Sequence, residues 1–219
     1  MIIENRFYIA TLNPSRGGSI SYLRNKKAER SLVFREGCEI WCPKWGGFSA
    51  NHYQQERVRS TKITVQKETT TTKVKVKSKL GNASNARIIR GWCVNNWVFK
   101  NDTPLIYCNS QIGAKDAEQA KGAYPNLFKK YICFYPGNYR HWAYREGDEV
   151  ISGLLGWNNL TSHFKKGGTG YYLTPNRGWI TLFNKDRGFA LISLKRTKTC
   201  EDLTLWQSKS KAERHSLRD

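Results

Sequence analysis

The strictest pattern in the chain is the alternation of residues 71–81, TTKVKVKSKLG, in which apolar residues and lysines take turns. Side chains of a β-strand point alternately to its two faces, so Val74, Val76 and Leu80 share one face. The other face carries Lys73, Lys75, Lys77 and Lys79. Same-face neighbours lie roughly 6.6–6.8 Å apart, which makes the lysines a row about 20 Å long. We expect the apolar face to point into a core and the lysines to point outward.

The lysine row has two possible uses. Lysines on a solvated strand discourage other strands from pairing with it at the edge of a sheet. A line of positive charge can also serve as a track for a polyanion. The choice between the two depends on the rest of the chain.

Alternating segments recur along most of the sequence, with turn residues between them. The expected strands are residues 6–12, 18–25, 31–36, 62–68, 72–80, 88–99, 105–112, 130–136, 149–157, 179–186, 188–196 and 203–207. One short helix is expected near residues 114–122. About a dozen strands with at most one or two short helices predict an all-β fold, a large antiparallel β-sandwich. We expect one domain over residues 1–207 and a charged C-terminal tail, residues 208–219, that frays.

The chain is strongly basic, with 37 Lys and Arg against 17 Asp and Glu and a formal net charge of +20 at pH 7. Such an excess attracts nucleic acid, acidic glycans or anionic surfaces, and here it is spread along the chain rather than gathered in a tail. No apolar run reaches the ~20 residues of a membrane helix, and the first residues show no export signal. We therefore expect a cytoplasmic protein without a membrane partner.

The cysteines give no sign of a metal centre. The six cysteines include no CxxC pair, and the closest spacing joins Cys38 and Cys42. We therefore expect neither a metal site nor a cofactor. The sequence leaves the redox state of the thiols and the oligomeric state open.

The N-terminal segment 5–33, NRFYIATLNPSRGGSISYLRNKKAERSLV, has the order strand, turn, strand and basic turn, with Gly17 and Gly18 in the first turn. Glycine supplies the backbone freedom that a tight turn requires. Together with segments 86–112 and 178–194, this order resembles the β-supersandwich of galactose mutarotase-like proteins, which include aldose epimerases and the β-domains of glycoside hydrolases and polysaccharide lyases. The resemblance extends over about residues 5–207 as a pattern of strands and turns.

The resemblance implies a protein that binds or processes carbohydrate. Galactose mutarotases carry a histidine in an Asn-His-aromatic motif, a second histidine and a late catalytic glutamate. Here residues 51–53, NHY, correspond to the first motif, and no late glutamate corresponds to the last. If the chain is an enzyme, the resemblance therefore implies a polysaccharide lyase or glycoside hydrolase rather than a true mutarotase.

Residues 135–149, YPGNYRHWAYREGDE, form the densest group of polar and aromatic residues. Sugar rings stack on flat aromatic faces, arginine grips carboxylates in bidentate fashion, and His, Tyr and Glu can move protons. The catalytic candidates in this segment are His141, Tyr144 and Glu146, and the substrate-binding candidates are Arg140 and Trp142. The alternative is a surface loop whose aromatic residues anchor it to the sheet.

A second group lies in residues 39–60, with His52 as a catalytic candidate and Trp45 and Arg57 as substrate-binding candidates. The resemblance to the β-supersandwich implies that early and middle loops both reach the concave face of the sheet, which would bring His52 and His141 to one cleft. Residues 163–179 have glycines beside lysines but lack the GxxxxGKS/T order of a phosphate loop, so we interpret them as a flexible loop with Tyr172 as a substrate-binding candidate. The tryptophans within strand patterns are assigned to core packing: Trp92, Trp97, Trp179 and Trp206.

These observations predict a carbohydrate-binding or carbohydrate-processing protein whose ligand is an acidic polysaccharide. The alternative is a non-enzymatic polyanion-binding protein whose partner is nucleic acid or an acidic partner. Convergence of His52, His141, Arg140 and a carboxylate in one cleft would favour an enzyme. A continuous basic stripe without such a cleft would favour the alternative.

Overall fold

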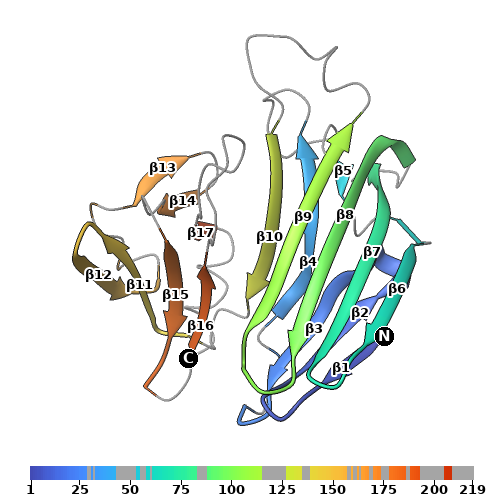
Figure 1. Ribbon diagram of the computed structural model, residues 1–219. Coiled ribbons are helices and arrows are strands. Elements are labelled where there is room, and N and C mark those ends of the chain that lie inside the picture. Colours follow the sequence, from blue (N-terminus) through green and yellow to red (C-terminus); the bar gives the residue numbers. More distant parts are fainter. Residues whose placement is uncertain are drawn as a thin grey trace. The chain divides into compact units, whose positions relative to one another are not determined.

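Figure 1 shows the computed structural model of the 219-residue chain. It describes residues 1–28, 31, 33–42, 53–54, 58–59, 61–82, 88–114, 127–134, 139–156, 159, 162, 164–167, 170–173, 178–185, 188–192 and 205–208. Within these ranges only the backbone is described for residues 33–42, 53–54, 81–82, 88–91, 112–114, 127–134, 165–167, 170–173 and 205–208.

The chain divides into two compact units, unit 1 (Met1–Phe134) and unit 2 (Tyr135–Asp219). Every strand pair among the described residues joins two strands of the same unit. The sequence analysis predicts one domain over residues 1–207, a stretch that contains unit 1 and most of unit 2. Alternation identifies strands one at a time and does not say which strands pair, so it carries no signal for this boundary.

Unit 1 is a set of antiparallel strands joined into one sheet. Its strands are β1 (Ile2–Glu4), β2 (Tyr8–Asn13), β3 (Ser19–Asn25), β4 (Val33–Cys42), β5 (Tyr53–Gln54), β6 (Lys62–Lys67), β7 (Thr71–Asn82), β8 (Ile88–Lys100), β9 (Ile106–Ala114) and β10 (Leu127–Phe134). Their order is β1-β2-β3-β4-β5-β7-β8-β9, with β6 also pairing with β7 and β10 with β4. Strand β7 therefore has neighbours on both sides, β8 on one and β6 and β5 on the other.

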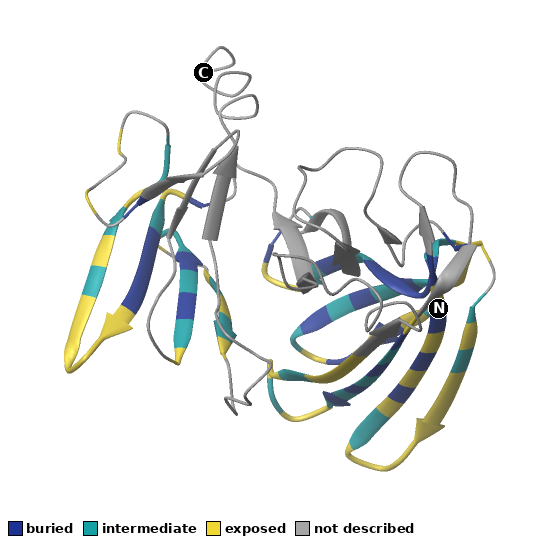
Figure 2. Ribbon diagram, turned by 90° about the horizontal axis from the view of Figure 1, so that it is seen from above, coloured by how far each residue is buried: buried dark blue, intermediate teal, exposed yellow. Residues whose placement is uncertain are grey.

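The core of unit 1 lies between the N-terminal strands and strands β7 and β8. Buried and exposed residues alternate along these strands, which gives the banded colouring of Figure 2. Tyr8 of β2 packs against Phe99 of β8 with ring centroids 6.3 Å apart, and the Asn5 side chain donates a hydrogen bond to the Lys100 carbonyl oxygen at 2.7 Å. These contacts join two layers around one apolar interior, as in a β-sandwich.

The turn between β2 and β3 shows why the sequence places two glycines there. A short 3₁₀ turn, Pro14–Arg16, is followed by Gly17 at φ 67° and Gly18 at φ 70°, a left-handed conformation that glycine adopts readily. A Cβ on Gly18 would lie 2.5 Å from Cγ1 of Val76 on β7. The paired-glycine turn expected from the sequence is confirmed, and it also lets the turn approach the facing layer closely.

Unit 2 contains two smaller antiparallel sheets. Its strands are β11 (His141–Glu146), β12 (Glu149–Leu154), β13 (Lys165–Gly167), β14 (Gly170–Leu173), β15 (Trp179–Phe183), β16 (Gly188–Ile192) and β17 (Leu205–Ser208). One sheet has the order β12-β11-β15-β16 and the other β13-β14-β17. Trp142, Ile180 and Leu182 are buried on the first sheet, and Phe164 packs against Trp142.

The predicted fold class, an all-β antiparallel sandwich, is confirmed. The described residues form no α-helix, and no described helix is long and apolar enough to cross a membrane. Residues 163–179, interpreted as a loop, instead contain the hairpin β13–β14. Most of the expected helix, residues 115–122, and residues 209–219 of the expected tail lie outside the described residues.

Candidate functional site

Strand β7 has the two faces that its alternation predicts. Val74, Val76 and Leu80 are at most 1% exposed. The lysines of the opposite face are all exposed: Lys73, Lys75, Lys77 and Lys79. The prediction that the valines point inward and the lysines outward is confirmed, so the register of this strand follows from its sequence.

The neighbouring strands extend this basic surface. Residues that pair across adjacent strands share a face, so the partners of the β7 lysines also point outward. Lys62 of β6 lies directly opposite Lys77, and Trp92 of β8 lies directly opposite Lys79. We call the outward positions of β6 to β9 the lysine face: Lys62, Thr64, Gln66, Lys73, Lys75, Lys77, Lys79, Trp92, Val94, Asn96, Val98, Lys100, Tyr107, Asn109, Gln111 and Gly113.

The charges of the lysine face are of one sign. None of its positions holds Asp or Glu. Among the described residues, a carboxylate reaches it from the β6–β7 turn, where Lys73 Nζ lies 2.7 Å from Glu68 Oε1. Hydrogen bonds from Lys73 and then Thr71 lower the pKa of Glu68 from its ordinary value of 4.5. In the part of the chain that the structure describes, Lys75, Lys77 and Lys79 form no ion pair, so their charges face solvent.

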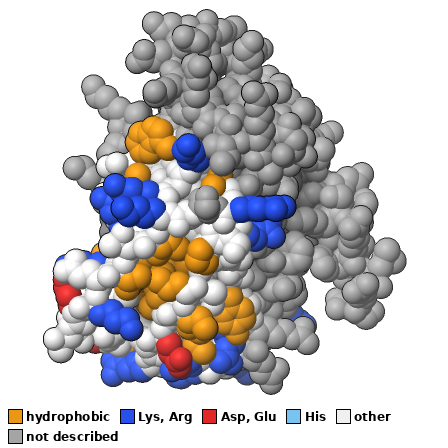
Figure 3. All heavy atoms as spheres, turned by 90° about the vertical axis from the view of Figure 1, so that its right-hand side faces the viewer, with side chains coloured by type: hydrophobic (Ala, Val, Ile, Leu, Met, Phe, Trp, Pro, Cys, Tyr) orange, Lys and Arg blue, Asp and Glu red, His pale blue; other side chains and the backbone are white. Residues whose placement is uncertain are grey.

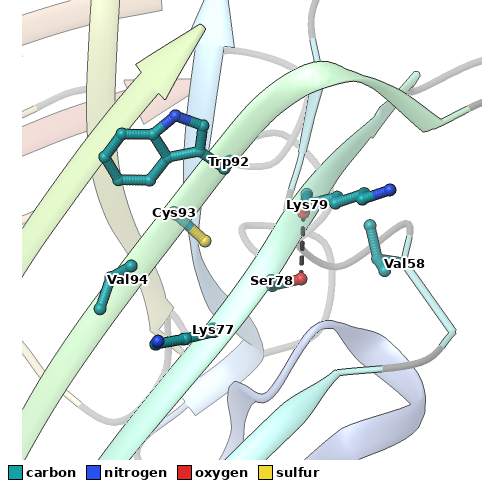
Figure 4. Close-up of a pocket in the computed structure, with 7 residues that line it drawn as sticks. All are labelled: Val58, Lys77, Ser78, Lys79, Trp92, Cys93 and Val94. Atoms are coloured by element: carbon teal, nitrogen blue, oxygen red, sulfur yellow. Dashed lines mark hydrogen bonds between the residues drawn. The ribbon is translucent and has the colours of Figure 1, made fainter.

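Trp92 lies at the end of the lysine row nearest β5. Its side chain is 43% exposed, and no ring contact joins it to another described aromatic residue. Its partner on β9 is Gly113, which has no side chain to cover the indole. A hollow of about 450 Å³ near this end of β7 and β8 is lined from both faces of the two strands, by outward Lys77, Lys79, Trp92 and Val94 and by buried Val58, Ser78 and Cys93 (Figure 4). An open aromatic ring on the strand next to a row of lysines can stack on a flat ligand while anionic groups of that ligand meet the lysines.

The surface around β6 has few acidic groups. Figure 3 shows the side of the molecule nearest β6 in Figure 1, where Lys and Arg side chains surround a group of apolar side chains and few Asp or Glu are visible. A field of one sign over a surface raises the local concentration of oppositely charged ligands.

The site predicted in residues 135–149 has a different arrangement. Most of its candidates lie on one strand, β11, rather than on a loop. His141 lies directly opposite Phe183 of β15, with ring centroids 5.2 Å apart. Tyr144 is three positions further along, so it points to the other face of the sheet. His141 and Tyr144 therefore do not meet in one site.

Trp142 lies in the core of unit 2. Its side chain is 0% exposed, its ring stacks on Tyr144 and meets Phe164 edge to face, and its Nε1 donates a hydrogen bond to the Leu154 carbonyl oxygen at 3.2 Å. A Cβ on Gly153 would lie 2.6 Å from the indole, so this glycine leaves the room that the ring occupies. Stacking on a sugar needs an exposed ring face, which Trp142 lacks in this arrangement.

Tyr144 and Glu146 form a pair on the inner face of β11. The Tyr144 hydroxyl donates a hydrogen bond to Glu146 Oε2 at 3.2 Å. Burial raises the pKa of Tyr144, and the hydrogen bond and charge of Glu146 raise it further. A tyrosine that accepts a proton near neutral pH needs a lowered pKa, so this environment does not prepare Tyr144 to act as a base.

The remaining predicted site residues give less information. Arg140 is exposed, and its backbone N–H donates to the Asn184 side chain at 2.6 Å. Trp45, His52 and Arg57 lie outside the described residues. Tyr172 lies on β14, where only the backbone is described. Among the residues with described side chains, no group of His, Cys, Asp or Glu has the geometry of a metal site.

Sequence reasoning missed Trp92 and Lys62 as site residues. Trp92 was assigned to the core with Trp97; Trp97 is buried as expected, whereas Trp92 points outward. The separation of the two tryptophans along the strand could have shown this. Residues an odd number of positions apart on a strand point to opposite faces, and Trp92 and Trp97 are five positions apart. Lys62 becomes part of the site only through its pairing with β7, which the sequence does not give.

Comparison with known proteins places no further constraint on the site. The sequence matches no protein-family model, and the search of curated proteins finds no relative. The function is therefore argued from the geometry of the chain alone.

Proposed function

We propose that this chain is a non-enzymatic binding protein that holds an extended polyanion against the lysine face of unit 1. One observation carries the proposal: four adjacent strands present lysines and polar or aromatic side chains outward without a single carboxylate among them. Polyanions bind such surfaces through many charge contacts rather than one deep pocket.

The position of β7 argues against a purely protective role for its lysines. Lysine on an edge strand prevents unwanted pairing, but β7 is paired on both sides over Lys73, Lys75 and Lys77 and has no free edge there. Its lysines are also not needed to break an apolar surface, since Thr64, Gln66 and Asn96 already make the face polar. Binding of an anionic ligand would account for the repeated lysines of β7, whereas the stability of the fold does not require them.

The arrangement of Lys62 and Lys77 supports the same conclusion. Like charges that lie directly opposite on adjacent strands destabilise the sheet. A carboxylate at either position would remove this cost. The presence of lysine at both positions, despite this cost, fits a surface whose positive charge binds an anionic ligand.

An enzyme acting on an acidic polysaccharide has less support. That hypothesis needs proton-transfer groups in one cleft, whereas His141 and Tyr144 lie on opposite faces of β11. The likeness to galactose mutarotase-like proteins stays a prediction. An acidic polysaccharide still belongs to the proposed ligand class, as a chain of repeated anionic groups.

The proposal is tested by removing the free lysines. The triple variant K75Q/K77Q/K79Q is compared with K27Q/K67Q/K185Q, which removes the same charge from exposed lysines outside the lysine face. Binding of oligonucleotides and of sulfated or uronate oligosaccharides is measured by fluorescence anisotropy across a salt series. We expect the first variant to lose affinity. For the oligonucleotides, its plot of log affinity against log salt should flatten by about 0.7 for each phosphate that the protein no longer neutralises.

Equal loss in the two variants would overturn the proposal. It would mean that the charge of the whole protein acts as a nonspecific field and that the lysine face is not a site.

A further inference from the structure

We infer that the polyanion held on the lysine face is single-stranded nucleic acid, with an unpaired base stacked on Trp92. This inference rests on the proposed function and adds the chemical class of the ligand. It is carried by the side chains that accompany the lysines and by the spacing of the lysines along β7.

The cations of the lysine face are all of one kind. Each is a lysine and none is an arginine: Lys62, Lys73, Lys75, Lys77, Lys79 and Lys100. Arginine's planar fork matches the two oxygens of a carboxylate, so a surface that recognises uronates gains from arginine. Lysine binds phosphate as a point charge, without a preferred direction of approach. A row of lysines therefore suits a flexible phosphate backbone better than a series of carboxylates.

The spacing of the row favours an extended strand. Same-face lysines on β7 repeat at roughly 6.6–6.8 Å, about twice the 3.4 Å advance per nucleotide in one strand of a duplex. Stacked nucleotides would therefore pass two phosphates for each lysine. A single strand whose bases are unstacked can lengthen its phosphate spacing toward the lysine repeat.

Trp92 gives an unstacked base a place to bind. The indole is open to solvent, lies directly across from Lys79 and faces no side chain from Gly113 on its other side. Stacking of a base on an aromatic side chain is sequence-tolerant because every base has a π-face. A duplex keeps its base faces covered, so this contact is available only to a single strand.

The middle of the lysine face offers groups for base edges. Asn96 lies between Lys75 of β7 and Asn109 of β9, and Gln111 lies beside Val94 on the next row. Amide side chains both donate and accept hydrogen bonds, which suits the mixed edges of exposed bases. Tyr107 is less available, because Lys100 Nζ lies 5.4 Å from its ring centroid.

The test compares ligands that differ only in their bases. Fluorescence anisotropy measures binding of an oligothymidylate of about 15 nucleotides, near the upper end of known site sizes for single-strand binding domains. An abasic oligomer of equal length keeps every phosphate but has no base to stack. A duplex of the same length and a sulfated oligosaccharide complete the set, all at about 100 mM salt.

We expect the wild-type chain to bind the oligothymidylate more tightly than the other ligands. W92A should weaken oligothymidylate binding about 5- to 150-fold, the range for loss of one stacked base, and leave binding of the abasic oligomer unchanged. W92F keeps a ring and should retain most of the affinity, whereas W92L keeps only apolar bulk and should behave like W92A. Thermal unfolding of each variant checks that the fold is intact.

The outcomes separate this inference from the proposed function. Suppose that abasic and thymidylate oligomers bind alike, or that the sulfated oligosaccharide or the duplex binds more tightly, while K75Q/K77Q/K79Q weakens all of them. Single-strand recognition would then be wrong and polyanion binding on the lysine face would stand. If K75Q/K77Q/K79Q weakens none of the ligands more than K27Q/K67Q/K185Q does, both proposals fail.

Discussion

Lys62 of β6 and Lys77 of β7 lie directly opposite each other on adjacent antiparallel strands, both on the outward face of the sheet. Their ammonium groups repel, and no described carboxylate lies between the two strands at this position. The pair therefore costs stability while it strengthens the positive field of the lysine face. Stability and ligand binding should respond in opposite directions when this pair is changed.

The first prediction concerns Lys62→Glu. The variant turns a repelling cross-strand pair into an attracting one and should raise the free energy of unfolding of unit 1 by about 0.2–1 kcal/mol. It should also weaken binding of any polyanion to the lysine face, because the net charge there falls. Urea unfolding and anisotropy measure the two effects on the same sample.

Lys67→Glu is the matched control, since Lys67 is exposed on the same strand but lies opposite Thr72. It should leave stability within about 0.5 kcal/mol of wild type. A gain in stability equal to that of Lys62→Glu would show that repulsion from Lys77 is not the cause.

The second prediction compares two tryptophans whose roles the structure separates. Trp142 is enclosed by Tyr144, Phe164 and Gly153, so Trp142→Ala should lower the free energy of unfolding of unit 2 by about 3–5 kcal/mol. Trp92→Ala removes a half-exposed ring and should change stability far less. Urea unfolding followed by circular dichroism measures both variants.

The binding assay provides the converse measurement. Trp92→Ala should weaken binding of single-stranded nucleic acid, and Trp142→Ala should leave binding by folded unit 1 unchanged. Weaker binding by Trp142→Ala under conditions where the protein remains folded would show that Trp142 takes part in holding the ligand.

Strands β7 and β8 show how much of the structure can be predicted from the sequence. Alternation correctly predicts the faces of β7 because one face is apolar and the other is uniformly lysine. In β8 both faces contain apolar residues, with Trp92, Val94 and Val98 outward and Trp97 and Phe99 inward. The pattern there identifies a strand but does not say which face is buried, so Trp92 could not be placed.

The cluster on β11 was predicted to be a ligand site, with a surface loop as the alternative, for a related reason. The order His-Trp-Ala-Tyr-Arg-Glu has polar and aromatic residues on both faces, so composition suggested a ligand site. Gly153, inside the expected strand 149–157, was the available clue, because glycine within a strand marks close approach by another group. Here the approaching group is the indole of Trp142.

The third prediction concerns the buried phenol of Tyr8. Its hydroxyl makes no hydrogen bond of good geometry with a described residue, and burial raises the pKa of Tyr8 to about 12 against a smaller, opposing effect of the Asn5 side chain. Tyr8→Phe removes a desolvated hydroxyl that makes no hydrogen bond of good geometry, so the free energy of unfolding at pH 7 should stay the same or rise by up to about 1 kcal/mol.

The same substitution should change the response to alkaline pH. The pKa of Tyr8 in the folded chain lies above its ordinary value of 10.0, so the folded state holds the phenolic proton more tightly than the unfolded state. Stability from this proton is complete below about pH 10 and is lost as the pH rises toward 12. Urea unfolding at a series of pH values should show a steeper loss in wild type than in Tyr8→Phe. Identical slopes would contradict burial as the cause.

The last prediction uses the carboxylate that borders the lysine face. Glu68 accepts hydrogen bonds from Lys73 Nζ at 2.7 Å and from Thr71 Oγ1 at 2.8 Å, which withdraws Lys73 from the free lysines of the row. Glu68→Gln should release Lys73 and raise the affinity for a single-stranded oligonucleotide. The salt dependence should steepen by up to about 0.7, the value for one more neutralised phosphate.

Glu149→Gln removes the same charge from an exposed position in unit 2 and serves as the control. The pKa of Glu68 lies below its ordinary value of 4.5, so its carboxylate persists to lower pH than that of a free glutamate. As the pH falls through this lowered pKa the carboxylate is protonated, and wild-type affinity should rise toward that of Glu68→Gln. If both glutamine variants raise affinity equally, Lys73 is not held back by Glu68, and the binding surface would be broader than the row on β7.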